Sequence, residues 1–98
     1  MYVIVWEFVV RSEAVERFED LYGASGGWVN LFRGHRGYLD TELIADVDRA
    51  GRYLTIDRWV TQETYESFRA IAEGDVEKLD AVGRELTLEE RFVGAFRG

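Results

Sequence analysis

Residues 53–68 decide the fold, and they read YLTIDRWVTQETYESF. The first seven residues of this stretch are rich in β-branched and aromatic side chains, which is typical of a strand inside a sheet. From Thr61 onward the apolar residues recur at helical spacing, so the strand is predicted to run directly into a helix. The strand nevertheless carries Asp57 and Arg58. Charged side chains inside a sheet cost free energy unless they are paired or used, and this stretch is therefore the first place to look for function.

The remaining segments predict three more strands and the helices that connect them. Apolar periodicity, glycine-rich breaks and a polar hairpin loop mark their bounds. The expected elements are a strand at 2–10, a helix from Ser12 to residue 23, a short helix or turn at 28–34, strands at 38–46 and 52–60 around a loop at 46–51, a helix from Thr61 that is interrupted at Gly74 and continues to 86, and a strand at 89–96.

The order β-α-β-β-α-β predicts a ferredoxin-like α+β fold. We interpret residues 1–98 as one domain, because a chain of this length has no room for a second core. In this arrangement we expect the first and third strands to be central, parallel neighbours. Glu7 would then lie close to Asp57, Arg58 and Trp59.

The first strand also predicts an oligomer. Its residues are apolar on both faces, apart from Glu7. Two helices can cover only one face of the sheet, so we expect a partner subunit to cover the other. The resulting assembly would be a homodimer that closes into an α+β barrel.

Composition excludes several classes of function. The formal net charge is −7, from 19 acidic and 12 basic residues, which disfavours nucleic acid and anionic membranes as partners. Cysteine is absent, so no disulfide or thiolate nucleophile is available. No signal peptide pattern or membrane-spanning apolar run is present, and we expect a cytoplasmic protein. The spacing of His, Asp and Glu does not suggest a metal site, and no glycine-rich phosphate loop or nucleotide-cofactor fingerprint appears.

Three short stretches resemble one known family. They are Val5-Trp6-Glu7-Phe8 in the first strand, Gly37-Tyr38-Leu39 at the start of the second, and residues 54–59 followed by a helix with Tyr65 and Phe68. Over residues 2–72, and more loosely beyond them, the chain resembles the antibiotic biosynthesis monooxygenase family of dimeric α+β barrels. The resemblance implies a homodimer with a pocket between the helices and the sheet of each subunit. Members of the family include cofactor-free oxygenases of aromatic polyketide quinols and haem-degrading monooxygenases.

The resemblance assigns roles to some residues and departs from the family at others. Trp59 matches a tryptophan that lines the pocket, and Tyr65 matches the pocket tyrosine of the polyketide oxygenases. Thr55 stands where those enzymes carry an asparagine, and Glu7 stands where the haem-degrading members carry one. No histidine occurs between residues 60 and 98 to serve as the iron ligand of those members. We therefore expect no cofactor.

Two carboxylates are candidates for a general base. Burial of Glu7 beside a pocket would raise its pKa toward neutrality, as a general base requires. Alternatively, Glu7 pairs with Arg58 or faces a hydrated dimer seam. Asp57 shares a strand face with Thr55 and Trp59, because side chains alternate along a strand. It could hold a base or a substrate hydroxyl, or it could form an ion pair between elements.

Aromatic residues and one histidine complete the candidate site. Trp59, Tyr65 and Phe68 could form an aromatic wall around a substrate, with plain core packing as the alternative. His35 lies in a polar loop and could transfer protons or, with its arginine neighbours, bind an anionic ligand. A loop histidine can equally be solvated. Thr55, His35 and Phe68 are the candidate substrate-binding residues, beside the candidate catalytic residues Glu7, Asp57, Trp59 and Tyr65.

The predicted function is a small cofactor-independent monooxygenase that acts on an aromatic or polyketide-like substrate. A base would remove a proton from a phenol or an activated carbon, and the anion would reduce dioxygen directly. Two other functions remain open. One is a non-catalytic protein that binds a small ligand in the same pocket. The other is an isomerase or cyclase, because one scaffold can support several chemistries.

Overall fold

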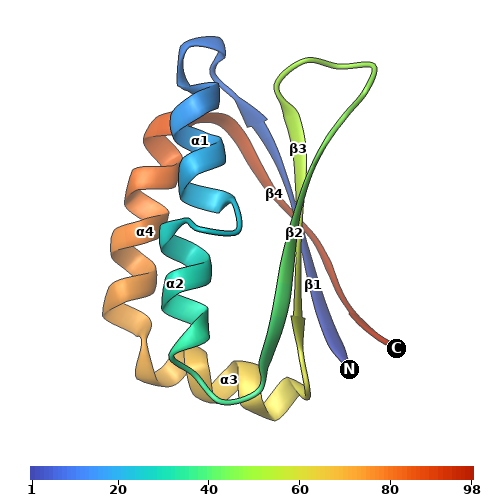
Figure 1. The fold of residues 1–98 in the computed structure, drawn as a ribbon, viewed down its shortest axis with the longest axis vertical. Coiled ribbons are helices and arrows are strands. Elements are labelled where there is room, and N and C mark those ends of the chain that lie inside the picture. The colour runs from blue at the N-terminus through green and yellow to red at the C-terminus, as the bar shows by residue number, and fades with distance from the viewer.

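Four strands form one antiparallel sheet, and the helices cover one of its faces (Figure 1). The computed structural model describes residues 1–98, and the strand order is β2-β3-β1-β4. The strands are β1 (Tyr2–Val10), β2 (Tyr38–Ala45), β3 (Arg52–Trp59) and β4 (Thr87–Arg97). The helices are the 3-10 turn η1 (Ser12–Ala14), α1 (Val15–Tyr22), α2 (Gly27–Arg33), α3 (Gln62–Ile71) and α4 (Glu73–Leu86).

This arrangement confirms the ferredoxin-like α+β fold but corrects one part of its predicted topology. β1 and β3 are central neighbours, yet they are antiparallel rather than parallel. The hairpin between β2 and β3 reverses the chain, and the helical crossover makes β1 parallel to β2, so β3 must oppose both. Glu7 consequently lies opposite Leu54, and Ile4 lies opposite Asp57. The expected closeness of Glu7 to Asp57, Arg58 and Trp59 is therefore wrong.

One predicted helix boundary, the start of α3, is confirmed, and two others differ from the prediction. Thr61 caps α3 as predicted, because its hydroxyl accepts a hydrogen bond from the Thr64 N–H and the Thr64 hydroxyl accepts one from the Thr61 N–H, which completes a capping box. Ser12 does not cap a helix with its side chain and instead opens the turn η1. The long helix breaks at Ala72, between α3 and α4, two residues before the predicted interruption at Gly74.

The core between the helices and the sheet consists of two aromatic clusters. In one cluster, Phe8 of β1 packs against Phe18 and Tyr22 of α1, with ring centroids 5.3 and 4.8 Å away. The other cluster is built around Trp59 and Phe68, whose centroids are 5.1 Å apart. These paired rings hold α1 and α3 against β1 and β3, with about 0.5–1.5 kcal/mol per aromatic pair beyond simple burial.

No helix covers the opposite face of the sheet (Figure 1). Apolar side chains lie on it, including Val5, Ile56, Ile44 and Phe96, and the last two are 43% and 51% exposed. We call this surface the open face. It accounts for the apolar residues of β1 that the helices do not bury. The structure contains no helix long and apolar enough to cross a membrane.

Candidate functional site

A cavity of about 270 Å³ lies between the helices and the sheet. β1 supplies aromatic and aliphatic lining, β2 and β3 supply polar side chains, and α3 supplies two rings. Thr41, Thr55 and Asp57 come from the sheet, while Tyr65 and Phe68 come from α3. Aromatic rings from β1, α1, α2 and α3 supply most of the apolar lining, and charged residues of α3, α4 and β4 also border the cavity, so it combines an aromatic wall with several polar groups.

Asp57 of β3 is one of two carboxylates that the sheet places at this cavity, and the other is Glu90 of β4. It keeps some accessible surface because it borders the cavity, yet protein surrounds it and it forms no ion pair. Burial raises the pKa of Asp57 to about 6, and the charge of Asp40 acts in the same direction. A hydrogen bond from the Thr41 hydroxyl, at 2.7 Å, partly opposes this shift by stabilising the ionised form. A carboxylate with a pKa near 6 can accept a proton close to neutral pH.

The aromatic wall contains only two of the three predicted rings. Tyr65 and Phe68 line the cavity, whereas Trp59 is fully buried and lies outside the lining. The indole of Trp59 packs edge-on against Tyr65, with centroids 5.6 Å apart, and its Nε1 has no hydrogen-bond partner. Trp59 therefore supports the wall from behind. Burial also raises the pKa of Tyr65, which stays a neutral phenol.

Thr55 lies in the cavity lining, although only 4% of its surface is exposed. It faces the helices from the strand position two residues before Asp57, and its hydroxyl makes no hydrogen bond to any other group of the protein. The side chain is therefore free to bond a ligand. Substrate contact by Thr55 stays a prediction, and the structure places the residue in the lining.

His35 does not enter this cavity. Its ring packs edge-on against Phe68, with centroids 4.9 Å apart, and it lines a separate open groove beside Arg36 and Thr64. Phe68 separates this groove from the cavity, since it lines both. The start of β2 can lie this close to α3 only because residue 37 is glycine, with φ +90°; a Cβ there would lie 2.4 Å from the Cβ of Thr64.

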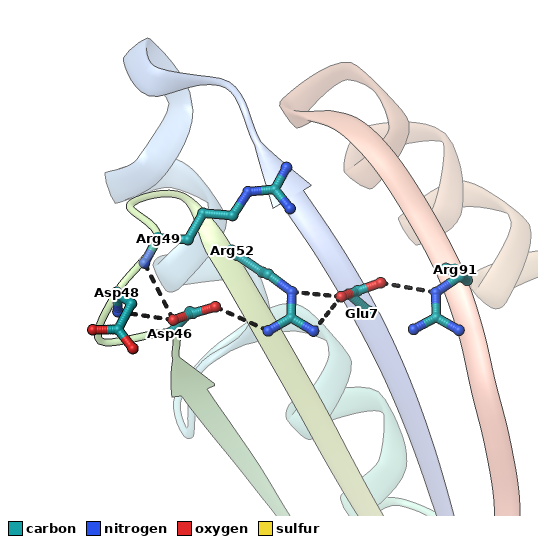
Figure 2. Close-up of polar contacts among 6 residues, drawn as sticks. All are labelled: Glu7, Asp46, Asp48, Arg49, Arg52 and Arg91. Carbon is teal, nitrogen blue, oxygen red and sulfur yellow. Dashed lines mark hydrogen bonds and ion pairs between the residues drawn. The ribbon is translucent and has the colours of Figure 1, made fainter.

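Glu7 lies on the open face, away from the cavity (Figure 2). Arg52 contacts one of its carboxylate oxygens at 2.5 Å, and Arg91 donates to the other at 2.8 Å. Arg52 also pairs with Asp46 at 2.9 Å. The hydrogen bonds from Arg91 and Arg52 lower the pKa of Glu7, so the expected rise in its pKa is wrong. Arg58, the alternative partner predicted for Glu7, instead pairs with two carboxylates of β2.

Several lining residues were missed from the sequence. They come from α3, α4, β2 and β4: Arg69, Asp80, Arg84, Thr41 and Glu90. The charged residues of α3 and α4 carry no signal of their own in the sequence, because apolar periodicity indicates only which face of a helix is buried. Thr41 could have been found from the hairpin, because a loop at 46–51 places it near the middle of β3.

The donor atoms of the site do not match an iron-ligating haem pocket. The only histidine of the chain lies outside the cavity, and the cavity lining contains no other side chain that commonly ligates haem iron except tyrosine. No group of three or more histidine, aspartate or glutamate side chains is arranged to hold a metal ion.

Comparisons with known proteins agree with this geometry. The family model described as antibiotic biosynthesis monooxygenase matches residues 1–73. The chain belongs to the antibiotic biosynthesis monooxygenase family. Its match covers β1 to α3, which includes every sheet residue of the cavity except Glu90. No match was found among curated proteins.

Solved structures show the fold of this family member. A variant of SnoaB from Streptomyces nogalater, described as a cofactor-independent oxygenase, superposes with a TM-score of 0.80 at 21% identity, over 99% of this chain and 91% of SnoaB. A putative antibiotic biosynthesis monooxygenase from Deinococcus radiodurans gives 0.76 at 14% identity, over 100% and 92% of the two chains. One from Nitrosomonas europaea gives 0.73 at 14% identity, over 100% and 98%. At these identities the likeness concerns the fold.

Proposed function

We propose that this protein is a cofactor-independent monooxygenase that acts on an aromatic substrate with an ionisable hydroxyl, and that Asp57 is its general base. The observation that carries the proposal is an unpaired carboxylate in an aromatic cavity, with a pKa raised to about 6. Membership of the monooxygenase family and the likeness to a cofactor-independent oxygenase support the same chemistry.

The proposed reaction converts a phenol and dioxygen into a quinone and water. Asp57 takes the phenol proton, and the phenolate transfers electrons to dioxygen as a ring carbon forms a bond to one oxygen atom. The ring carbon then loses its hydrogen as a proton, and the O–O bond breaks. One oxygen atom stays on the ring as the quinone carbonyl, and the other leaves as water with the two protons. Dioxygen takes four electrons in total, and all of them come from the substrate.

The lining residues divide the remaining tasks. Tyr65 and Phe68 would hold the aromatic ring, and the free hydroxyl of Thr55 would bond a second oxygen of the substrate. Enclosure between the helices and the sheet would keep water from the anion. A cavity of about 150 Å³ binds benzene in another protein, so a cavity of about 270 Å³ favours a substrate with roughly two fused rings.

Oxygen uptake tests the proposal most directly. Purified, metal-free protein would be mixed with reduced phenols of one, two and three fused rings, and oxygen consumption would be compared with quinone formation. We expect one quinone per dioxygen with the best substrate, and loss of turnover in Asp57→Asn. Asp48→Asn is the matched control, because Asp48 lies in the exposed β2–β3 loop and its carboxylate bonds nothing.

Two results would reject the proposal. One is full oxygen uptake by Asp57→Asn, which would remove Asp57 as the base. The other is turnover that depends on an added metal ion or flavin, which would remove the cofactor-independent mechanism. Equal loss in Asp48→Asn would indicate damage unrelated to the cavity.

A binding or accessory role is the second candidate. It is favoured by Thr55, which replaces the amide of the polyketide oxygenases, and by Trp59, which lies outside the cavity. Tight binding of a phenol without turnover would support this role. Turnover that does not consume oxygen would instead support an isomerase or cyclase.

We also propose that a second copy of the chain covers the open face. The exposed apolar residues there and the apolar pattern of β1 support a homodimer. The cavity lies on the other face, so each subunit would keep its own site.

A further inference from the structure

An irregularity in β2 brings two side chains to Asp57 that regular strand alternation would separate. Tyr38 pairs with Trp59 and Thr41 pairs with Asp57, so β2 advances three residues while β3 advances two. The extra residue lies between Tyr38 and Asp40, where the register shifts. In a regular strand, residues three apart point to opposite faces. This bulge lets both Tyr38 and Thr41 face the helices, and bulges often redirect side chains in this way beside active sites.

The two side chains form a directed chain of hydrogen bonds to Asp57. The Tyr38 hydroxyl donates to Thr41 Oγ1 at 2.8 Å, and Thr41 Oγ1 donates to Asp57 Oδ1 at 2.7 Å. Each hydroxyl has one proton and donates it to the next group, so the hydrogen bonds run from Tyr38 through Thr41 to Asp57. Asp57 Oδ2 makes no hydrogen bond within the protein. The carboxylate is thus anchored through one oxygen and leaves the other for a ligand.

Aromatic packing anchors the far end of this chain. The ring of Tyr38 lies 5.3 Å from Phe32 and 5.4 Å from Trp59, measured between centroids. Trp59 is fully buried, so it limits the movement of the Tyr38 ring. Trp59 can therefore influence the site without touching a ligand.

We infer that Thr41 and Tyr38 are positioning residues that hold Asp57 through Oδ1, so that Oδ2 alone accepts the proton of the substrate. This inference rests on the proposed function, in which Asp57 is the base. A phenol enters with its O–H directed at Oδ2, and the carboxylate needs no reorientation when the proton moves. Loss of the Thr41 hydroxyl frees the carboxylate to rotate and removes the hydrogen bond that favours its ionised form.

Other titratable groups act on Asp57 or face the same cavity, and they enter the pH dependence. Asp40 of β2 pairs with Arg58 outside the cavity and raises the pKa of Asp57 through its charge. The phenols of Tyr22 and Tyr65 line the cavity from α1 and α3. The charged groups elsewhere in the lining are Arg69, Asp80, Arg84 and Glu90. β1 contributes only apolar and aromatic side chains to the lining. The test therefore measures the titration of the Asp57 carboxyl directly, because a pH profile of the rate would combine the titrations of several groups.

The experiment measures the titration of the Asp57 carboxyl carbon by NMR in protein labelled with carbon-13, without ligand. The wild-type midpoint is expected at about pH 6. Thr41→Val should raise this midpoint by about one pH unit, because the ionised form loses its one hydrogen bond. Thr41→Ser keeps a hydroxyl and should restore the wild-type midpoint. Tyr38→Phe should raise it by roughly half a unit or less, because it weakens Thr41 as a donor only indirectly.

Kinetics with the best phenol provide the second readout. Thr41→Val should lower kcat by about tenfold to a hundredfold with little change in KM, since substrate still fits and only orientation is lost. Thr41→Ser should regain most of kcat. Circular dichroism confirms folding of each variant, and Thr41→Ala replaces Thr41→Val if the valine variant does not fold.

The outcomes separate the inference from the proposed function. Two results would overturn the positioning role even if the wild-type enzyme consumes oxygen. One is an Asp57 midpoint in Thr41→Val equal to that of wild type, and the other is a midpoint in Thr41→Ser as high as that in Thr41→Val. The predicted midpoints with no oxygen uptake by any variant would support the anchoring of Asp57 and reject the oxygenase.

Discussion

The two faces of the sheet hold carboxylates in opposite electrostatic states. On the open face, Glu7 receives hydrogen bonds from Arg52 and Arg91, and its pKa is lowered (Figure 2). On the helix side, Asp57 has one hydroxyl donor and no cation, and its pKa is raised to about 6. The pKa values of two carboxylates on adjacent strands are thus shifted in opposite directions, because the fold gives them different neighbouring side chains.

The comparison shows that a buried carboxylate is a candidate general base only where no cation pairs with it. Glu7 is enclosed, with only 15% of its side chain exposed, but two guanidinium groups satisfy its charge. A carboxylate held in this way is a poor proton acceptor near neutral pH. Asp57 has no such partner, so its ionised form is destabilised by burial and readily accepts a proton from a substrate.

Turnover should show the largest effect of this difference. Asp57→Asn should lower kcat/KM by about 10²–10⁴-fold, which is the usual contribution of general base catalysis. Glu7→Gln, a matched loss of one carboxylate on the open face, should leave kcat/KM within about twofold, because Glu7 does not line the cavity. Steady-state oxygen uptake measures both. Equal losses in the two variants would break the comparison between the faces.

Stability should respond to pH with opposite signs at the two sites. The folded-state pKa of Asp57 lies above its ordinary value of 3.8, so the folded state binds the proton more tightly and loses stability as pH rises from about 4 to 6. Asp57→Asn should therefore gain up to about 3 kcal/mol relative to wild type between pH 4 and pH 7. Urea unfolding at the two pH values measures this gain.

The matched variant Glu7→Gln should show the reverse trend. The pKa of Glu7 is lowered in the folded state, so its stabilising contribution is present above about pH 4.5 and is lost as pH falls. The variant should be less stable than wild type at pH 7 and closer to wild type at low pH. A pH-independent difference for either variant would contradict the assigned pKa direction.

The open face should be sensitive to charge if a second copy covers it. Ile56→Lys places an ammonium group among the apolar residues of this face and should weaken a homodimer by about tenfold to a hundredfold. Val47→Lys is the matched control, because Val47 lies in the β2–β3 loop and is 95% exposed. Sedimentation over a range of protein concentrations measures both. A monomeric wild-type protein would reject the homodimer.

The sequence predicted the elements well and the contacts less well. Alternating and helical periods located all four strands, the Thr61 cap and the shared face of Thr55, Asp57 and Trp59, because these depend on local geometry. The partners of Glu7 depend on strand direction and register, and the parallel assignment of β1 and β3 placed it beside the wrong arginine. The hydrogen bond from Tyr38 to Thr41 depends on a bulge between Tyr38 and Asp40, which no single-strand pattern reveals.

Trp59 is where the family resemblance and the structure differ most, and it should give the smallest effect. The resemblance implies a pocket tryptophan, yet the indole is buried behind Tyr65 and its Nε1 has no partner. Trp59→Phe removes an unsatisfied buried donor, which offsets part of the lost packing, so stability should change by no more than about 1 kcal/mol. The cavity lining is unchanged, so KM should stay within about threefold.

A modest fall in kcat is still expected from Trp59→Phe, since the smaller ring loosens Tyr38 and through it Thr41 and Asp57. This makes the KM and kcat of one variant a test of how Trp59 acts. A rise in KM of about tenfold or more would mean that the indole contacts substrate directly. An unchanged KM with a lower kcat, and a higher Asp57 midpoint, would mean that Trp59 acts only through the residues that hold the carboxylate.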